Sequence, residues 1–310
     1  MTNLVLHHYP QSPFAEKGRL LLGFKKLAYG SVIIPRVMPK PDLVALTGGY
    51  RKTPVLQDGA DLYCDTALIA RRVEREKADP PLFPRGLEAA AATLAHWADH
   101  ELFQHSVTLN FQPEVMAARF AGVPEEHVRA FAADRQALFG DGNAQRLPLP
   151  LVRAHWPVLL GRLEAQLQSQ AFVLGAAPCV ADLAHYHPLW FVASSPMLAA
   201  SLEPYEAVRA WMQRVAAIGH GTPAKLDAAA AVESARSSEP AMLVPNAFVD
   251  PSGFVVGQAV TVAAADYGVD PTPGTLVWQD AEEIVIARDD ARAGHVHVHF
   301  PRLGFRVAAA

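Results

Sequence analysis

The sequence has few cysteines, no long apolar run and no excess of basic residues. Only two of its 310 residues are cysteine, Cys64 and Cys179, which is too few for a disulfide framework. No uninterrupted apolar run reaches about 18 residues, so we expect no membrane span. The N-terminus lacks a basic segment followed by a long apolar one, so we expect no signal peptide and a cytoplasmic location.

The charge balance also excludes a class of partner. Charged residues make up 19% of the chain, and the formal net charge is −4. A nucleic-acid-binding protein usually carries a basic surface patch, so we expect no nucleic-acid partner. Hydrophobic residues make up 51%, which is typical of a globular protein with two or three domains at this length.

One stretch, LVLHHYPQSPFAEKGR at residues 4–19, organises the chain. It begins as an apolar strand that Tyr9-Pro10 ends, and Ser12-Pro13 then stands where a helix would begin. Serine is a favoured N-cap and proline a favoured first helical residue. Because free N–H groups and the helix dipole point at such a turn, it is a natural site for an anion or a thiolate.

The rest of the first 78 residues alternates between strands and helices. SVII at 31–34 is a candidate strand, and the prolines at 35, 39 and 41 predict a loop after it. Asp58-Gly59 between two short apolar runs indicates a hairpin, and 66–77 has the apolar spacing of a helix. We assign residues 1–78 to one α/β domain with a mixed sheet.

Two further segments follow a proline-rich linker at 79–84. The pattern is helical over 88–231, with candidate helices at 87–109, 125–139, 151–168, 179–192 and 206–218, and 228–239 is a linker or a fraying helix. Residues 243–310 instead contain five short strand candidates, at 260–262, 276–278, 283–287, 295–300 and 305–307. Their number and spacing predict a small β-barrel or roll of unknown role.

Three motifs in order resemble the glutathione S-transferase superfamily. They are Ser12-Pro13-Phe14-Ala15 after the first strand, Lys52-Thr53-Pro54-Val55-Leu56, and Cys64-Asp65-Thr66-Ala67-Leu68-Ile69. The second resembles that family's cis-proline strand, and the third its acidic residue at a helix start. The resemblance covers about three quarters of the chain. It implies an α/β thioredoxin-like domain followed by an all-α domain. The small all-β C-terminal domain predicted from the strand candidates lies outside the family pattern.

The resemblance implies a site for glutathione as co-substrate. The tripeptide would pair with the strand edge after Pro54 through the backbone of Val55. Asp65 and Thr66 would hold its γ-glutamyl end, and a lysine its glycyl carboxylate. The implied glutathione-binding residues are Lys40, Lys52, Thr53, Pro54, Val55, Asp65 and Thr66. Asp65 stands where the family more often has Glu or Gln.

The glutathione thiol also needs activation, because a free thiol has a pKa of about 8.5. By resemblance Ser12 would donate a hydrogen bond to the thiolate, and Tyr9 is the rival donor. Ser12 and Ala15 stand where glutaredoxins carry cysteines, so dithiol exchange and cysteine-dependent thioltransfer are excluded at this turn. Cys64 precedes a different helix and is no substitute.

The second substrate is expected to be a small hydrophobic electrophile. Phe14, Phe103, Phe111 and Met116 are the candidate lining residues, although ordinary core positions explain each of them as well. His295, His297 and His299 alternate on one strand, where neighbours on one face lie about 7 Å apart. With no acidic or cysteine partner identified, we predict no metal site there.

The resulting prediction is a glutathione S-transferase-like enzyme that attacks a hydrophobic electrophile and, as is usual in the family, forms a homodimer. One alternative is a non-catalytic binding or scaffold protein with the same fold. A further alternative is a glutathione-dependent isomerase or dehalogenase, which would share the first domain.

Overall fold

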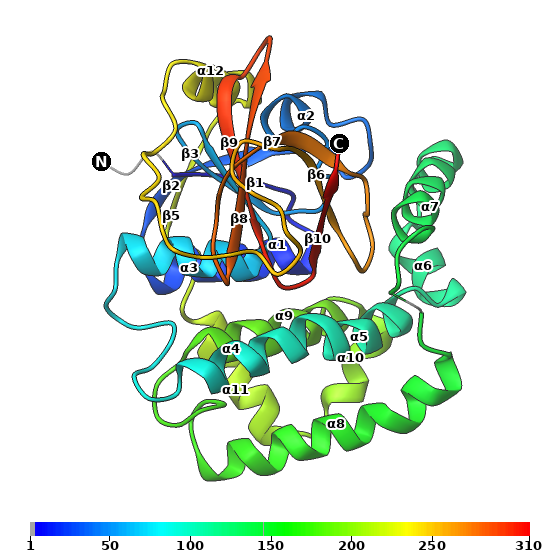
Figure 1. Cartoon of the computed structure of the whole chain (residues 1–310). Helices are drawn as coiled ribbons and strands as arrows, with labels where there is room; N and C mark the ends of the chain where they lie inside the picture. Colours follow the sequence, from blue (N-terminus) through cyan, green and yellow to red (C-terminus); the bar gives the residue numbers. More distant parts are fainter. Residues whose placement is uncertain (1–3, 145) are drawn as a thin grey trace.

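The structure, a computed structural model, describes residues 4–144 and 146–310. Figure 1 shows a β layer stacked on a layer of helices. The first elements run in the predicted order, with one helix, α2, added where a loop was expected: β1 (Leu4–His8), α1 (Pro13–Phe24), β2 (Ala28–Ile33), α2 (Pro41–Thr47), β3 (Val55–Asp58), β4 (Asp61–Cys64) and α3 (Thr66–Glu76). The missed helix begins at Pro41, and proline is favoured at a first helical position.

The four strands of this part form the predicted mixed sheet. β1 pairs with β2 in parallel and with β3 antiparallel, and β4 pairs antiparallel with β3. All five residues of β1 are buried, which is typical of a central strand. The turn that follows β1 therefore starts from a fixed position.

The helical layer matches the predicted helices closely. The 87–109 helix is interrupted by a π turn, and α6 and α10 were not predicted. The elements of the helical layer are α4 (Glu88–Trp97), the π turn (Ala98–Leu102), α5 (Phe103–Asn110), α6 (Pro113–Arg119), α7 (Glu125–Phe139), α8 (Leu149–Ser169), α9 (Val180–Ala193), α10 (Pro196–Ala199), a 3-10 turn (Ala200–Leu202) and α11 (Glu206–Ala216). Figure 1 shows α6 and α7 rising beside the β layer, away from the other helices.

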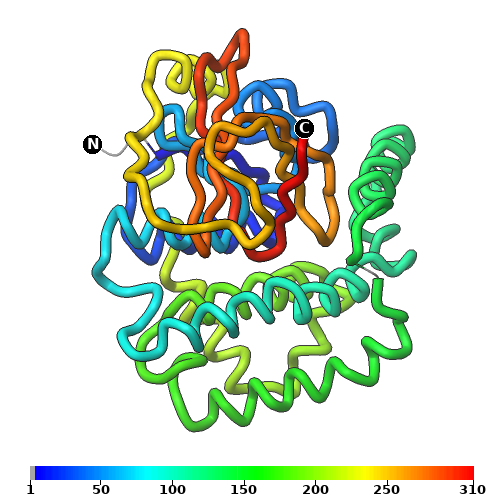
Figure 2. The backbone as a smooth tube through the Cα atoms, viewed as in Figure 1, coloured from blue at the N-terminus to red at the C-terminus, as the bar shows by residue number. Residues whose placement is uncertain are grey.

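The chain then returns to the first sheet. β5 (Thr222–Lys225) pairs in parallel with β2, and α12 (Ala228–Arg236) lies where a linker or fraying helix was predicted. Figure 2 follows this path from the green helical layer back to the yellow and red β layer. Both edges of the thioredoxin-like sheet are thereby covered, one by β5 and the other by the strands that follow.

The C-terminal segment forms the five predicted strands, β6 (Ala259–Ala264), β7 (Thr272–Gln279), β8 (Glu283–Asp290), β9 (Gly294–Pro301) and β10 (Phe305–Ala309). They do not close on themselves as a separate barrel. β9 pairs in parallel with β4, so that one sheet runs in the order β10-β6-β7-β8-β9-β4-β3-β1-β2-β5. The sequence gives no sign of this pairing, because parallel partners can lie far apart along a chain.

Two apolar cores lie on opposite faces of the sheet. One joins α1 and α3 to the helical layer and includes Leu21 and Trp211, both fully buried. The other joins α2 and α12 to the C-terminal strands and includes Leu46 and Phe300. Because the second core draws on both ends of the chain, the C-terminal strands are an integral part of the fold. Among the described residues, no helix is long and apolar enough to cross a membrane.

Candidate functional site

The main cavity lies where the turn after β1 meets α5, α6, α7 and α9, and its volume is about 490 Å³. This is within the usual range of small-molecule sites. A second cavity of about 310 Å³ lies between α3, α4 and the C-terminal strands. Phe14, Lys52 and Tyr267 line both cavities, so the two are neighbours separated by these side chains.

Ser12 stands at the entrance to α1 and lines the main cavity. Its hydroxyl oxygen accepts a hydrogen bond from the N–H of Ala15 at 3.1 Å, the expected N-cap geometry. A hydroxyl can donate as well as accept, so its proton can serve a ligand atom. Tyr9 lines the same cavity, and its carbonyl oxygen accepts from the Ser12 N–H at 3.2 Å.

Thr53 also lines the main cavity, and the Thr53–Pro54 peptide bond is cis, as predicted. Pro54 lies beneath it, against a space of about 20 Å³. Val55 is fully buried and has ladder partners on both sides, His7 of β1 and Cys64 of β4. Its backbone therefore faces the sheet, and Thr53 is the nearest residue of this segment at the cavity surface.

The two predicted lysines have different environments. The Lys40 ammonium donates to the carbonyl oxygen of Arg51 at 3.0 Å and reaches Thr53 Oγ1 at 3.5 Å. Burial, together with neighbouring arginine charges, lowers the pKa of Lys40 to about 8. Lys52 forms an ion pair with Asp266 at 2.5 Å, and its ammonium lies 4.1 Å from the centre of the Tyr267 ring.

Asp65 and Thr66 begin α3, as predicted. Asp65 has a positive φ of 74°, and its carboxylate accepts from the N–H of Ala67 at 2.8 Å. Thr66 is 2% exposed, and its hydroxyl oxygen has no hydrogen-bond partner among the described residues. Both residues line the small space beside Pro54, and Asp65 also lines the second cavity.

Tyr267, in the loop between β6 and β7, lies where the two cavities and the small space beside Pro54 meet. It lines all three spaces, and its ring stacks on Phe139 of α7 with the ring centres 4.7 Å apart. The space left between Tyr267 and Pro54 is about 20 Å³, enough for roughly one water molecule. A C-terminal loop therefore lies over Pro54, Asp65 and Thr66, three of the predicted glutathione-binding residues.

The remaining wall of the main cavity is aromatic and basic. Phe14, Phe103 and Phe111, which were named as candidate lining residues for a second substrate, line this cavity, and the Phe14 ring lies 4.6 Å from that of Phe103. Met116 instead lines an adjoining hollow of about 500 Å³, which it shares with Phe111. Of the residues that the structure describes, six cationic side chains line the main cavity: Arg36, Lys40, Arg51, Lys52, Arg119 and Arg135.

A buried charge network lies behind the cavity wall. Lys17 of α1 forms an ion pair with Asp99 of the π turn, and His187 of α9 bonds to the same carboxylate at 2.9 Å. Burial alone would raise the pKa of Asp99, but the Lys17 charge and the His187 hydrogen bond outweigh it and lower the pKa to about 2. The Phe14 ring covers His187 at 4.5 Å. The network joins the first helix to the helical layer.

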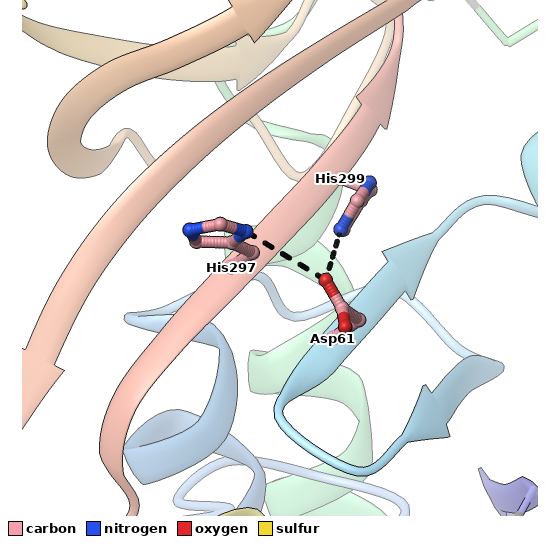
Figure 3. Close-up of side chains that lie close together, drawn as sticks. All are labelled: Asp61, His297 and His299. Atoms are coloured by element: carbon pink, nitrogen blue, oxygen red, sulfur yellow. Dashed lines mark hydrogen bonds and ion pairs between the residues drawn. The ribbon is translucent and has the colours of Figure 1, made fainter. Parts of the chain in front are cut away.

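The C-terminal histidines meet an acidic partner that the sequence did not reveal. Figure 3 shows Asp61 of β4 between His297 and His299 of β9. The Asp61 carboxylate lies 2.9 Å from His299 Nε2 and 3.7 Å from His297 Nδ1, while His299 Nδ1 bonds to Glu283 at 2.6 Å.

The three potential ligand atoms of Asp61, His297 and His299 lie within 4.8 Å of one another. However, both ring nitrogens of His299 are already held by carboxylates. Burial alone would lower the pKa of His299, but these two hydrogen bonds outweigh it and raise the pKa. A doubly donating imidazolium has no lone pair for a metal ion, so we interpret the cluster as an ion network that joins β9 to β4.

Sequence reasoning missed Arg36, Arg119 and the Asp266–Tyr267 pair. Arg36 lies in the proline-rich stretch after β2, and Arg119 ends a helix that was not predicted. Tyr267 lies in a segment that was assigned to a separate domain. Each comes from a different part of the chain, and only the tertiary structure brings them to one cavity.

Comparisons with known proteins match the thioredoxin-like part and the helical layer of the chain separately. Residues 6–81 match the glutathione S-transferase N-terminal domain, and residues 152–218 match the glutathione S-transferase C-terminal domain. The crystal structure of a GST-like protein from Pseudomonas syringae is 47% identical, with 100% of both chains covered and a TM-score of 0.85. That match includes the C-terminal strands.

Two other proteins are similar to part of the chain. FtsZ-localized protein A from Caulobacter vibrioides is 26% identical over 185 residues, 58% of this chain and 72% of that protein. The structure of glutathione S-transferase III in apo form is 20% identical, covers 69% of this chain and 92% of that chain, and has a TM-score of 0.52, which shows the fold alone. Together with the full-length match, the two domain matches show that this chain belongs to the glutathione S-transferase superfamily.

Proposed function

We propose that the protein binds glutathione along the first domain and activates its thiol for attack on an electrophile. The observation that supports this most is the position of Ser12. Its hydroxyl lies at the N-terminus of α1 and faces the same cavity as Lys40 and Thr53. A thiolate placed there would meet both a hydrogen-bond donor and the positive end of a helix dipole.

The tripeptide would lie across three places. Thr53, the residue before Pro54 at the cavity surface, would offer its backbone to the cysteinyl unit in place of the buried Val55. Lys40, which has no carboxylate partner among the described residues, would hold the glycyl carboxylate, with Lys52 as the alternative. Asp65 and the unpartnered hydroxyl of Thr66 would take the γ-glutamyl end.

The chemistry requires a lower thiol pKa. A helix N-terminus and a hydrogen-bond donor both stabilise the thiolate and so lower the pKa from its usual value of about 8.5. The thiol loses its proton to solvent, and the thiolate sulfur then forms a bond to the electrophilic carbon as the leaving group departs with its electron pair. Tyr9 remains the rival donor, since it lines the same cavity.

The test is glutathione-dependent turnover with a panel of aryl halides, epoxides and haloalkanes. We expect Ser12→Ala to lower kcat/KM by about 10²-fold or more, as the loss of a donor to a developing anion does elsewhere. Ser12→Thr retains both the hydroxyl and the helix cap and should keep most of the activity. Ser194→Ala, at another wall of the cavity, is the matched control. Unchanged turnover in Ser12→Ala, with loss in Tyr9→Phe, would move the role to Tyr9.

A non-catalytic binding protein is the second candidate, and the loop between β6 and β7 favours it. Asp266 neutralises Lys52, and Tyr267 leaves about 20 Å³ beside Pro54. A fold kept for binding a partner would tolerate such closure. A saturable, glutathione-dependent rate on any member of the panel would count against this candidate, and the same panel separates transfer from isomerisation or dehalogenation. The homodimer and the cytoplasmic location remain predictions, which light scattering and cell fractionation would test.

A further inference from the structure

The main cavity contains two arginines that have no carboxylate partner among the described residues, Arg36 and Arg119. Arg36 follows β2, and its guanidinium centre lies 5.2 Å from the centre of the Phe131 ring. Its Nε atom is buried and has no hydrogen-bond partner among the described residues. Arg119 lies at the end of α6, with its guanidinium 4.8 Å from the Phe191 ring centre and one N–H donated to the neutral side chain of Asn110.

The other cations of the cavity have carboxylate partners nearby, with one exception. Asp134 pairs with both Arg51 and Arg135, and Asp266 pairs with Lys52. Lys40 has no carboxylate partner among the described residues, but it lies beside Thr53, at the glutathione end. Arg36 and Arg119 have none either within the ranges 4–144 and 146–310. No acidic residue is found among the described residues that line this cavity.

Placing two arginines without carboxylate partners in a partly buried cavity costs free energy. Burial lowers the pKa of Arg119, and the nearby charge of Arg36 lowers it further. Desolvated charges are usually paired or hydrogen-bonded in folded proteins. A bound anion would remove both the repulsion and the open hydrogen-bonding position at Arg36 Nε. Planar guanidinium groups fit carboxylate and sulfonate oxygens well.

We propose that this part of the cavity binds an aromatic molecule that carries one carboxylate or sulfonate group. The anionic group binds Arg36 and Arg119, and the aromatic ring packs among Phe111, Phe131 and Phe191. This inference deepens the proposed function, because it rests on the cavity being the second-substrate site and gives that substrate a charge. The predicted hydrophobic electrophile thus becomes an aryl anion rather than a neutral aryl compound.

The test compares two probes of the same shape, 2-naphthoate and 2-naphthamide, by tryptophan fluorescence and calorimetry without glutathione. Trp190 lines the cavity and can report binding. We expect the wild-type protein to bind the naphthoate at least tenfold more tightly than the amide. Arg36→Met and Arg119→Met should each reduce this ratio to below threefold. Arg209→Met, an exposed arginine on α11, is the matched control and should leave the ratio unchanged.

Equal affinity of the wild-type protein for the two probes would overturn the proposal, and so would no detectable binding of either at 5 mM. The wild-type comparison needs no variant and therefore survives a variant that fails to fold. Glutathione binding is measured separately. Naphthoate selectivity without glutathione binding would support this inference and contradict the proposed function, whereas glutathione binding without selectivity would do the reverse.

Discussion

Replacing Asp99 by asparagine should destabilise the protein strongly, because the carboxylate is the shared partner of two buried groups. Its side chain is 6% exposed, that of Lys17 is 1% exposed and that of His187 is fully buried. In Asp99→Asn the ammonium of Lys17 would stay buried without a counter-charge. Glu101, the other carboxylate of the π turn, is 52% exposed and lies 3.7 Å from His105, and no ion pair joins it to Lys17 among the described residues.

The expected loss can be estimated in two ways. Removing one partner of a buried ion pair typically costs about 3–5 kcal/mol. Independently, the fall in the pKa of Asp99 from 3.8 to about 2 corresponds to roughly 2 kcal/mol of stability at neutral pH. Because this pKa is lowered, that contribution is present above pH 3.8 and is lost as the pH falls towards 2. We therefore expect Asp99→Asn to cost about 2–4 kcal/mol.

Urea unfolding followed by tryptophan fluorescence measures this loss. Glu101→Gln, two residues along the same helix and half-exposed, makes the same charge change and should cost under about 0.5 kcal/mol. In the double variant Lys17→Met/Asp99→Asn this ion pair leaves no charge without a partner, so its loss should be smaller than the sum of the losses of Lys17→Met and Asp99→Asn by over about 1 kcal/mol. A loss below about 1 kcal/mol in Asp99→Asn, or strict additivity, would refute the reasoning.

Three further changes test other parts of the structure. The pKa of His299 is raised, so its imidazolium stabilises the fold below pH 6.5 and loses that effect as the pH rises through the raised pKa; the lowered pKa values of Asp61 and Glu283 act in the opposite direction on acidification. Hydrogen exchange of β9 should therefore be slowest at pH values between the lowered pKa values of the two carboxylates and the raised pKa of His299. His299→Gln should abolish the change in exchange rate that is due to the loss of the imidazolium at alkaline pH. Tyr267→Ala should tighten glutathione binding by about three- to tenfold in calorimetry, because the ligand no longer has to displace the ring; weaker binding would make Tyr267 a contact instead. Gly23→Ala should lower stability by about 3 kcal/mol or more in urea, since its Cβ would lie 1.9 Å from a backbone oxygen that follows α11, and a neutral change would contradict that packing.

Local sequence signals predicted most of the elements. Ser12-Pro13 gave the start of α1, Asp58-Gly59 the hairpin, and the apolar spacing the long helices, because each of these depends on neighbouring residues. The five C-terminal strands were predicted for the same reason. Their attachment was not, because the pairing of Asp61 with His297 across β4 and β9 joins residues more than two hundred positions apart.

The residues of the candidate site also divide into those with a local sequence signal and those without one. Ser12, Thr53 and Asp65 belong to short motifs and could be named from the sequence, and Ser12 and Thr53 line the main cavity. Arg36, Arg119 and Tyr267 carry no local signal. An isolated arginine is usually an ordinary surface residue, and an isolated tyrosine is found both inside proteins and on their surfaces. Their importance depends on which carboxylates neutralise the surrounding cations, and only the tertiary arrangement decides that.

Calorimetric titration of the wild-type protein with glutathione, with Asp65→Ala and Ser12→Ala beside it, tests the central claim most directly. The account predicts a dissociation constant in the micromolar to millimolar range for the wild type and weaker binding in Asp65→Ala. Ser12→Ala should bind glutathione nearly as well as the wild type, because its hydroxyl acts on the thiolate rather than on the peptide. Absence of binding at millimolar glutathione, in protein shown to be folded, would contradict the claim that this cavity holds the tripeptide.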